Sequence, residues 1–122
     1  MKGIGTDIIR IKQLAFVTKD LDDPFIQKTY TQKELDLILS RPVPLDAFAT
    51  RFAGKEAVFK SFGTAGNIVR LNEIEILENE VGQPTVILHR NAKIIAKDKD
   101  IRQVMISLSY DGEYAIAFAV AL

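Results

Sequence analysis

The sequence predicts an α+β protein, with helices over most of its first half and strands over most of its second. Apolar residues recur at helical spacing over residues 45–62, where four phenylalanines contribute to one long stripe. In the last strand, residues 114–122, alanine occupies every second position, and an alanine face admits a closely packed helix. The Asp111-Gly112 pair before that strand is a strong hairpin signal, so the closing strands are expected to be antiparallel.

The composition indicates a small globular protein. Its 122 residues fit one domain over 1–122, and a hydrophobic content of 48% allows a compact core. The 16 basic and 16 acidic residues cancel, which gives no support for a nucleic-acid or membrane partner. The chain has no cysteine and a single histidine, so any metal must be held by oxygen. No signal peptide and no apolar segment of membrane-spanning length are evident, and we expect a cytoplasmic protein.

The first strand is expected over residues 2–9. Its glycines share one face with Asp7, and glycines inside a strand often mark the close approach of a backbone or a ligand. A short helix is expected over residues 11–19. The segment Leu21–Asp23 then breaks the chain, and Pro24 is suited to the first turn of another helix.

Two helices with clear end signals follow. The segment Thr31–Glu34 has the form of a capping box, and apolar residues at helical spacing continue it until Pro42. The longest helix is expected over Leu45–Phe62, with Gly63 as its C-terminal cap. The glycines of the loop over 63–66 would permit a ligand to approach the backbone closely.

The rest of the chain is expected to be mainly strand. Glu73 and Glu75 alternate with isoleucines, which predicts a half-buried strand. A brief helix is expected with Ile94 and Ile95 directed inward. In order, these remaining elements are expected as strands over 73–76 and 85–88, a helix over 91–97, and strands over 104–110 and 114–122.

Glu56 lies inside the apolar stripe of the long helix. At about 100° per residue it falls on the face that carries Phe52 and Phe59. Burying an unpaired carboxylate is costly, so Glu56 needs a cation, a metal or a raised pKa. Lys60 follows one turn later, and the alternative is a simple surface ion pair between Lys60 and Glu56.

Asp7 is a second isolated carboxylate, in the apolar, glycine-rich opening of the chain. It could instead cap the following helix or pair with Arg10. Two hard oxygen ligands in apolar settings suggest a magnesium site formed by Asp7 and Glu56, and Lys60 suggests a phosphate beside it.

Three segments together resemble the motifs of holo-acyl-carrier-protein synthases, which belong to the 4′-phosphopantetheinyl transferase family. They occur in the same order as in that family and extend over almost the whole chain, and the central one is the most specific. The segments are Gly3–Ile8; Arg51–Ala57 with Lys60 and Phe62–Thr64; and Ile106–Tyr110 with Tyr114 and Ala115.

The resemblance implies that the protein transfers phosphopantetheine from coenzyme A to a serine of apo-acyl carrier protein. Adenosine 3′,5′-bisphosphate would be the by-product, and the reaction would serve fatty acid biosynthesis. It also implies an α+β fold in which an antiparallel sheet packs on a long central helix. Family members of this short kind form homotrimers with active sites between neighbouring subunits.

The resemblance also assigns roles to residues. Asp7 and Glu56 would bind magnesium, Lys60 would hold the leaving phosphate, and Glu56 or Asp7 would guide the loss of the serine proton. Tyr110 stands where the family commonly has His or Asp; it can donate a hydrogen bond but is a poor base at neutral pH. Contacts to coenzyme A are expected from Arg51, Lys60, Gly63, Thr64, Gln83, Pro84 and Tyr110.

Docking of the acidic carrier protein is expected to use basic residues near the N-terminus. The family commonly has arginines on its first helix, and this chain has Gln13 at one such place. The charges that would replace them are Arg10, Lys12, Lys19 and Lys28. The alternatives are a magnesium-dependent pyrophosphate hydrolase, a non-catalytic module that binds coenzyme A or a nucleotide, and a plain interaction domain.

Overall fold

The computed structural model describes residues 1–64 and 69–122. In order, its elements are β1 (Gly3–Arg10), the 3-10 helices η1 (Ile11–Leu14) and η2 (Val17–Lys19), α1 (Pro24–Thr29), α2 (Gln32–Leu39), α3 (Pro44–Ser61), the 3-10 helix η3 (Leu71–Glu73), β2 (Ile74–Glu78), β3 (Pro84–Leu88), α4 (Arg90–Asp98), β4 (Val104–Asp111) and β5 (Tyr114–Ala121).

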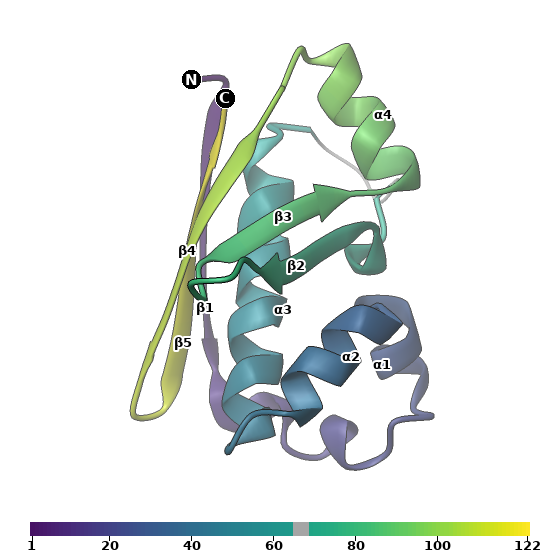
Figure 1. Ribbon diagram of the computed structural model, residues 1–122, viewed down its shortest axis with the longest axis vertical. Coiled ribbons are helices and arrows are strands. Elements are labelled where there is room, and N and C mark those ends of the chain that lie inside the picture. Colours follow the sequence, from purple (N-terminus) through teal and green to yellow (C-terminus); the bar gives the residue numbers. More distant parts are fainter. Residues whose placement is uncertain (65–68) are drawn as a thin grey trace.

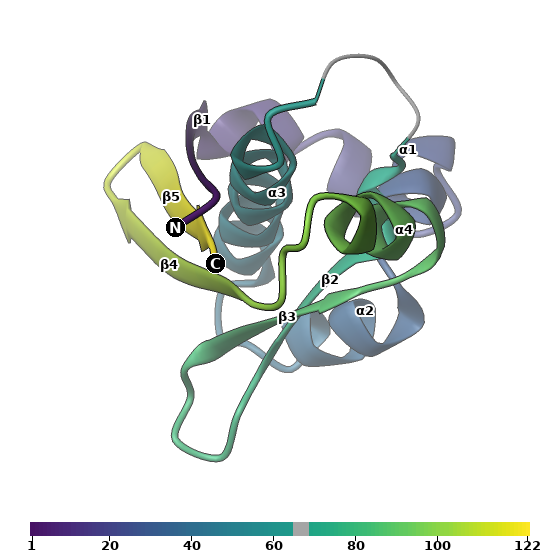
Figure 2. The ribbon, with the colours of Figure 1, turned by 90° about the horizontal axis from the view of Figure 1, so that it is seen from above.

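The strands form two antiparallel sheets, and the predicted α+β class is confirmed. One sheet has three strands in the order β1-β5-β4, and the other is the β2-β3 hairpin. Figure 1 shows α3 between the three-stranded sheet on one side and β2, β3 and the shorter helices on the other. Figure 2, seen from above, shows the same order of layers.

Helix α3 packs closely on the sheet because the residues that face it are very small. The alanines of β5 from Ala115 to Ala121 are all buried, as their spacing predicted. A Cβ atom on Gly5 would lie 2.0 Å from the carbonyl oxygen of Ala57, and one on Gly3 would lie 2.0 Å from that of Ser61. Glycine is therefore required at these two positions of β1, where backbone meets backbone.

The other side of α3 holds a buried ion pair. The Nζ atom of Lys55 lies 2.7 Å from Oε1 of Glu34, and both side chains are fully buried. Lys55 also donates to the carbonyl oxygens of Leu71, at 3.0 Å, and Ile74, at 2.5 Å, while Glu34 accepts a hydrogen bond from the backbone of Ile76 at 2.8 Å. The pair thus joins α2, α3 and the start of β2.

The end signals of the helices are confirmed, and three details differ from expectation. Thr31 and Glu34 form the predicted capping box, and Gly63 has a left-handed φ of 64° after α3. The region expected as one short helix over 11–19 forms two 3-10 turns instead. Ile94, expected to point inward, is 57% exposed because the buried face of α4 is made by Ala92 and Ala96.

The third difference is that β2 is buried on both faces at its start. Glu75 hydrogen-bonds Thr31, and its Oε1 atom lies 3.1 Å from Nε2 of His89. Glu73 accepts hydrogen bonds from the backbones of Arg70 and Asn91, at 2.7 and 3.1 Å. Both carboxylates are satisfied by partners outside the strand itself, which alternation along the sequence cannot reveal.

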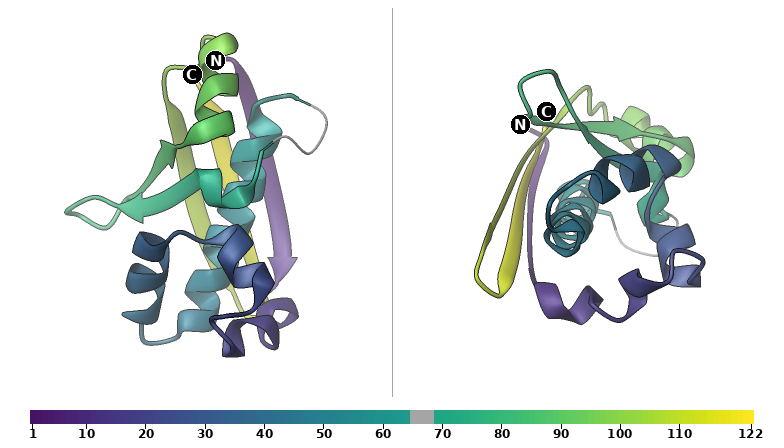
Figure 3. Two further views of the ribbon diagram at one scale, coloured as in Figure 1. Left: turned by 90° about the vertical axis from the view of Figure 1, so that its right-hand side faces the viewer. Right: turned by 60° about the horizontal axis from the view of Figure 1, so that its bottom comes forward.

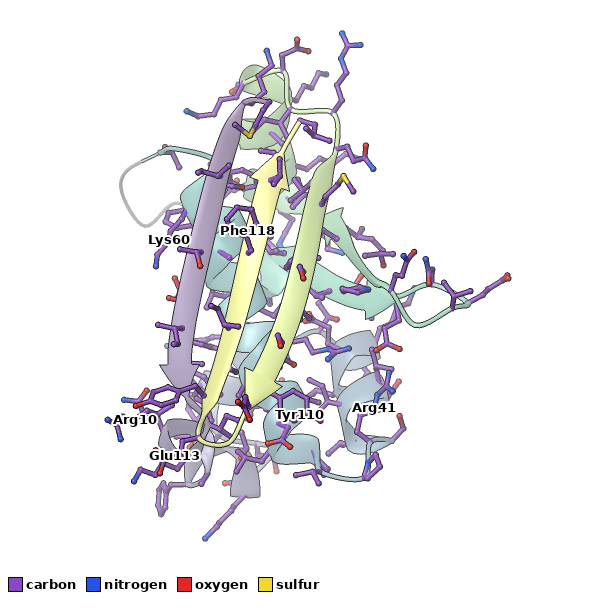
Figure 4. The ribbon with its side chains drawn as sticks, turned by 90° about the vertical axis from the view of Figure 1, so that its left-hand side faces the viewer. Arg10, Arg41, Lys60, Tyr110, Glu113 and Phe118 are labelled. Carbon is purple, nitrogen blue, oxygen red and sulfur yellow. The ribbon has the colours of Figure 1, made fainter. Side chains whose placement is uncertain are left out.

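The outward face of the three-stranded sheet is apolar and uncovered. Phe118 lies near the middle of this face on β5 and is 47% exposed (Figure 4). Other large apolar residues exposed on the same strands are Ile4, Ile8, Met105 and Ile116. Within the described residues, no helix is both long and apolar enough to cross a membrane.

Candidate active site

Asp7, Glu56 and Lys60 come together where β1 runs along α3. The Nζ atom of Lys60 donates to Oδ1 of Asp7 at 3.1 Å and to the carbonyl oxygen of Thr6 at 3.0 Å. Asp7 pairs in register with Ala117 and shares the face of β1 that carries Gly3 and Gly5, toward α3. The close approach that these glycines allow therefore places the acid of the strand beside the helix.

The electrostatics of Glu56 reflect this setting. Its side chain is half-buried, and burial raises its pKa above the ordinary value. The charge of Asp7 raises the pKa of Glu56 further, while the nearby charge of Lys60 lowers it in part. The two carboxylates are thus close enough to repel one another, which is the condition that a bound cation relieves.

The donor set suits magnesium. Among the residues that the structure describes, no three His, Asp or Glu side chains gather into a ready-made cage. Magnesium retains several waters and is commonly bound through one or two carboxylates plus substrate phosphates. Asp7 and Glu56 fit that pattern, and Lys60 provides a cation for a phosphate at the same place.

A second polar group lies at the opposite side of α3. Arg51 Nη2 lies 3.0 Å from Oε1 of Glu78, and Arg41 pairs with the other oxygen of the same carboxylate. Glu78 is the last residue of β2 and pairs in register with Pro84. Gln83, beside Pro84, is exposed in the turn. Arg51 is therefore joined through Glu78 to the hairpin, whose turn projects from the body of the molecule (Figure 3).

The two groups lie on opposite sides of the chain. Lys60 follows Arg51 by nine positions, a rotation of about 180° around a helix. In Figure 4, Lys60 lies beside β1 at one edge of the three-stranded sheet; at the other edge, Tyr110 lies at the end of β4 and Arg41 lies beyond that strand. Tyr110 is 57% exposed at the end of β4. One copy of the chain therefore brings Asp7, Glu56 and Lys60 together but not the predicted contacts Arg51, Gln83, Pro84 and Tyr110 with them.

The loop after α3 is described only in part. Gly63 and Thr64 follow directly on the turn of helix that carries Lys60. The remainder of the predicted glycine loop, including Gly66, lies outside the described residues.

Sequence reasoning missed two members of the second group. Arg41 follows α2 directly, where a basic residue has no distinctive pattern, and Glu78 looks like an ordinary strand-end carboxylate. Arg51 itself was singled out as part of the central motif, but no spacing along the sequence links it to Glu78.

Comparison with known proteins now settles the family. Residues 3–119 match the family described as the 4′-phosphopantetheinyl transferase superfamily. The chain belongs to this superfamily. It is 38% identical over 123 residues to a holo-[acyl-carrier-protein] synthase of Clostridium perfringens, in a match that covers 97% of this chain and 91% of the relative. A synthase of the same name from Desulforudis audaxviator is 33% identical over 98% of this chain and 92% of its own length.

Solved structures of phosphopantetheinyl transferases share the fold. The holo-[acyl-carrier-protein] synthase of Neisseria meningitidis superposes with a TM-score of 0.88 at 29% identity, over 100% of this chain and 98% of that one. The enzyme of Helicobacter pylori in complex with coenzyme A gives a TM-score of 0.83 at 25% identity, over 98% and 99% of the two chains.

Proposed function

We propose that this single domain, residues 1–122, transfers 4′-phosphopantetheine from coenzyme A to a serine of apo-acyl carrier protein, with magnesium as cofactor. The observation that carries the proposal is the meeting of Asp7, Glu56 and Lys60 between β1 and α3, on the motif residues of the family. The names of the relatives favour a transferase over a hydrolase or a binding module. We place the reaction in the cytoplasm and in fatty acid biosynthesis.

Asp7 and Glu56 would hold the magnesium ion, which when bound neutralises charge on the pyrophosphate of coenzyme A. The serine oxygen would attack the phosphorus on the pantetheine side, and the bond from that phosphorus to the bridging oxygen would break. Adenosine 3′,5′-bisphosphate would leave with that oxygen, while Lys60 stabilises its phosphate as a point charge. Most of the acceleration would come from positioning and charge.

The serine proton would go to the carboxylate of Glu56, directly or through a water. A carboxylate whose pKa is raised by burial and by a neighbouring acid accepts a proton more readily than an exposed one. Asp7 is the other candidate base. Its Oδ1 atom already accepts a hydrogen bond from Lys60, which makes Asp7 the second choice for this role.

A second copy of the chain would complete the site. Tyr110 and Arg41 lie on the far side from Lys60 (Figure 4), and Arg51 shares the Glu78 carboxylate with Arg41. Glu78 pairs in register with Pro84, beside Gln83, so one ligand would reach both groups only at an interface. Such an interface joins the β1 edge of one copy to the β4 edge of the next, and head-to-tail contacts of this kind close into rings. The apolar outward face around Phe118 is suited to the centre of a homotrimer.

Carrier protein would dock on basic residues from the end of β1 to α1. Arg10, Lys12, Lys19 and Lys28 are all exposed. Reversing the charge of Arg10 and Lys12 together should raise the KM for apo-acyl carrier protein and leave the KM for coenzyme A unchanged, because only the first ligand is acidic over a protein-sized surface. Equal rises in both constants in steady-state kinetics would argue against this docking surface.

Mass spectrometry tests the whole proposal. The protein is incubated with apo-acyl carrier protein, coenzyme A and magnesium, and the carrier protein is then weighed. A gain of one phosphopantetheine group, lost with chelator and absent from Glu56→Gln, is expected. Cleavage of coenzyme A without carrier protein would instead indicate a hydrolase, and binding without any product would indicate a binding module.

A further inference from the structure

The packing of α3 on the three-stranded sheet is formed by very small residues. They are Ala53 and Ala57 on the helix and Gly5, Ala117 and Ala119 on the strands. A helix is normally held at one rotation by side-chain ridges that pack into grooves, and alanine and glycine form only shallow ridges. This side of α3 therefore fixes the distance between helix and sheet much better than it fixes the rotation of the helix about its own axis.

Lys55 attaches the helix firmly on the opposite side. It precedes Ala57 by two positions, which is a rotation of about 200° around the helix. Its ammonium group has three donors, and they reach Oε1 of Glu34 at 2.7 Å and the carbonyl oxygens of Leu71 and Ile74 at 3.0 and 2.5 Å. Because all three donors are used and the side chain is fully buried, the end of the lysine is held at one point.

Glu34, the partner of Lys55, is itself held by the backbone. Its Oε1 atom also accepts a hydrogen bond from the backbone of Thr31 at 2.9 Å, and its Oε2 atom accepts one from the backbone of Ile76 at 2.8 Å. Burial lowers the pKa of Lys55, and the charge of Glu34 opposes that effect and so helps to keep the lysine protonated. The lysine is thus attached to a fixed carboxylate and not to a mobile one.

Rotation of α3 would be transmitted directly to the candidate site. Glu56 follows Lys55 in the chain, so the two side chains turn together with the helix. Side chains extend about 5–6 Å from a helix axis, and a rotation of about 10° would therefore move the Glu56 carboxylate by about 1 Å. Asp7 belongs to β1 and does not turn with α3. A displacement of about 1 Å can cost about a hundredfold in rate where groups must meet in one geometry.

We propose that Lys55 is a positioning residue, which through Glu34 fixes the rotation of α3 about its axis. The fixed rotation holds Glu56 at the distance from Asp7 at which both carboxylates can reach one magnesium ion. The inference rests on the proposed function, because that function assigns the metal to these two acids. The alternative is that the buried pair contributes only to the stability of the fold. The two explanations differ in what they predict for the response of the protein to magnesium.

Glu34→Gln tests this, because it keeps the shape of the side chain and removes the charge that holds Lys55. The magnesium concentration that gives half-maximal transfer should rise about tenfold or more, while the KM for carrier protein should change by less than about twofold. In calorimetry without coenzyme A, magnesium should raise the Tm of the variant less than that of the wild type. The matched control is Glu73→Gln, which alters another buried carboxylate, bound to the backbones of Arg70 and Asn91, and should leave the magnesium response unchanged.

The outcomes separate the two proposals. A wild-type protein without magnesium-dependent transfer would overturn the proposed function itself. A normal wild type, with an unchanged magnesium response in Glu34→Gln, would overturn only the positioning role and leave the pair a part in stability. If Glu34→Gln is poorly folded by circular dichroism, Glu34→Asp decides instead, since it keeps the charge but withdraws the carboxylate by about 1.5 Å. That variant should need more magnesium for half-maximal transfer, and a wild-type requirement would contradict the positioning role.

Discussion

At the scale of single residues, the candidate site consists of two acids that repel one another and one lysine that pairs with Asp7. Lys60 pairs with Asp7, while Glu56 is half-buried with a raised pKa. Asp7 and Glu56 therefore repel one another, and a cation bound between them would reduce that repulsion.

Replacement of Lys60 by alanine should separate catalysis from stability. The side chain is 52% exposed, so its ion pair with Asp7 should contribute less than about 1 kcal/mol to the free energy of unfolding. Transfer should nevertheless slow more than about tenfold, equivalent to about 1.4 kcal/mol in the barrier, because the lysine stabilises the leaving phosphate. Steady-state rates and urea unfolding measure the two effects. Lys93→Ala, which removes an exposed lysine of α4, is the control. A loss of rate smaller than about tenfold in Lys60→Ala would indicate that Lys60 is an ordinary surface lysine.

Glu56→Gln should change how the protein responds to magnesium. Ionisation of Glu56 disfavours the metal-free fold, since its pKa is raised; its contribution to stability therefore falls as pH rises from the ordinary carboxyl range through the raised pKa. At neutral pH the metal-free variant should melt at or above the wild-type temperature. Magnesium should raise the Tm of the wild type and of the control Glu113→Gln, but not of Glu56→Gln. Scanning calorimetry that finds equal shifts in all three would remove Glu56 from the metal site.

The sequence identified this acid pair but not its counterpart on the other side of α3. Glu56 could be identified because it interrupts a regular apolar stripe, and Asp7 because it stands alone among glycines and isoleucines. Arg41 and Glu78 do not interrupt any regular pattern of apolar residues in the sequence. Their significance comes from the folding of β2 against α3, a long-range contact that local spacing does not encode.

At the scale of elements, the contact between β1 and α3 sets the position of the site. Backbone rather than side chain forms much of this contact, through Gly3 and Gly5. The position of Asp7 is therefore fixed by how closely a strand can approach a helix. The sequence predicted this approach from the alanines and glycines, because small residues at every second position leave one face of a strand without bulky side chains.

Gly5→Ala should be far more damaging than Gly54→Ala. A Cβ atom at Gly5 would meet the carbonyl oxygen of Ala57 at 2.0 Å, and a backbone atom cannot move aside. At Gly54 the nearest atom is the flexible end of Ile76 at 2.6 Å, and alanine gains about 1 kcal/mol in helix propensity. We expect Gly5→Ala to lose about 2–3 kcal/mol or more in urea unfolding, together with activity, as Asp7 is displaced. Equal losses at both positions would contradict this account of the contact.

Elements on the other side of α3 were less accessible to sequence reasoning. Lys55 belongs to the central motif segment, and although lysines are mostly exposed it is fully buried against Glu34 of α2. Burial lowers the pKa of Lys55, and the adjacent charge of Glu34 opposes that effect. Helical spacing along α3 cannot reveal a partner twenty-one positions earlier in the chain.

At the scale of the whole molecule, the two parts of the proposed site lie at opposite edges of one sheet. Lys60 of the acid group (Asp7, Glu56 and Lys60) lies beside β1, and Arg41 of the arginine group (Arg41, Arg51 and Glu78) lies beyond β4 (Figure 4). No movement of side chains within one copy brings them together, since α3 separates them by half a turn. An assembly of copies is therefore part of the proposed chemistry and not only a source of stability.

Mixing two inactive variants should restore activity. Lys60→Ala damages the acid group and Arg51→Gln the arginine group, so a site between the two kinds of copy can have both groups intact. Random exchange of subunits should give about a quarter of the wild-type sites, assayed as carrier-protein modification at low coenzyme A. A mixture of Lys60→Ala with Glu56→Gln should stay inactive, because both changes damage the same group. No recovery in the first mixture would mean that each copy works alone.

Because the outward sheet face is apolar, protein concentration should affect both assembly and aggregation of the chain. In the proposed assembly, a newly synthesised copy would expose Phe118, Ile4 and Ile8 to water until another copy covers them. A high rate of synthesis raises the concentration of folded copies and shortens this exposure. It also raises the concentration of unfolded chains, which can aggregate on the same exposed apolar strands. Slow synthesis at low temperature, followed by concentration of the folded product, should therefore yield more soluble material than rapid synthesis does.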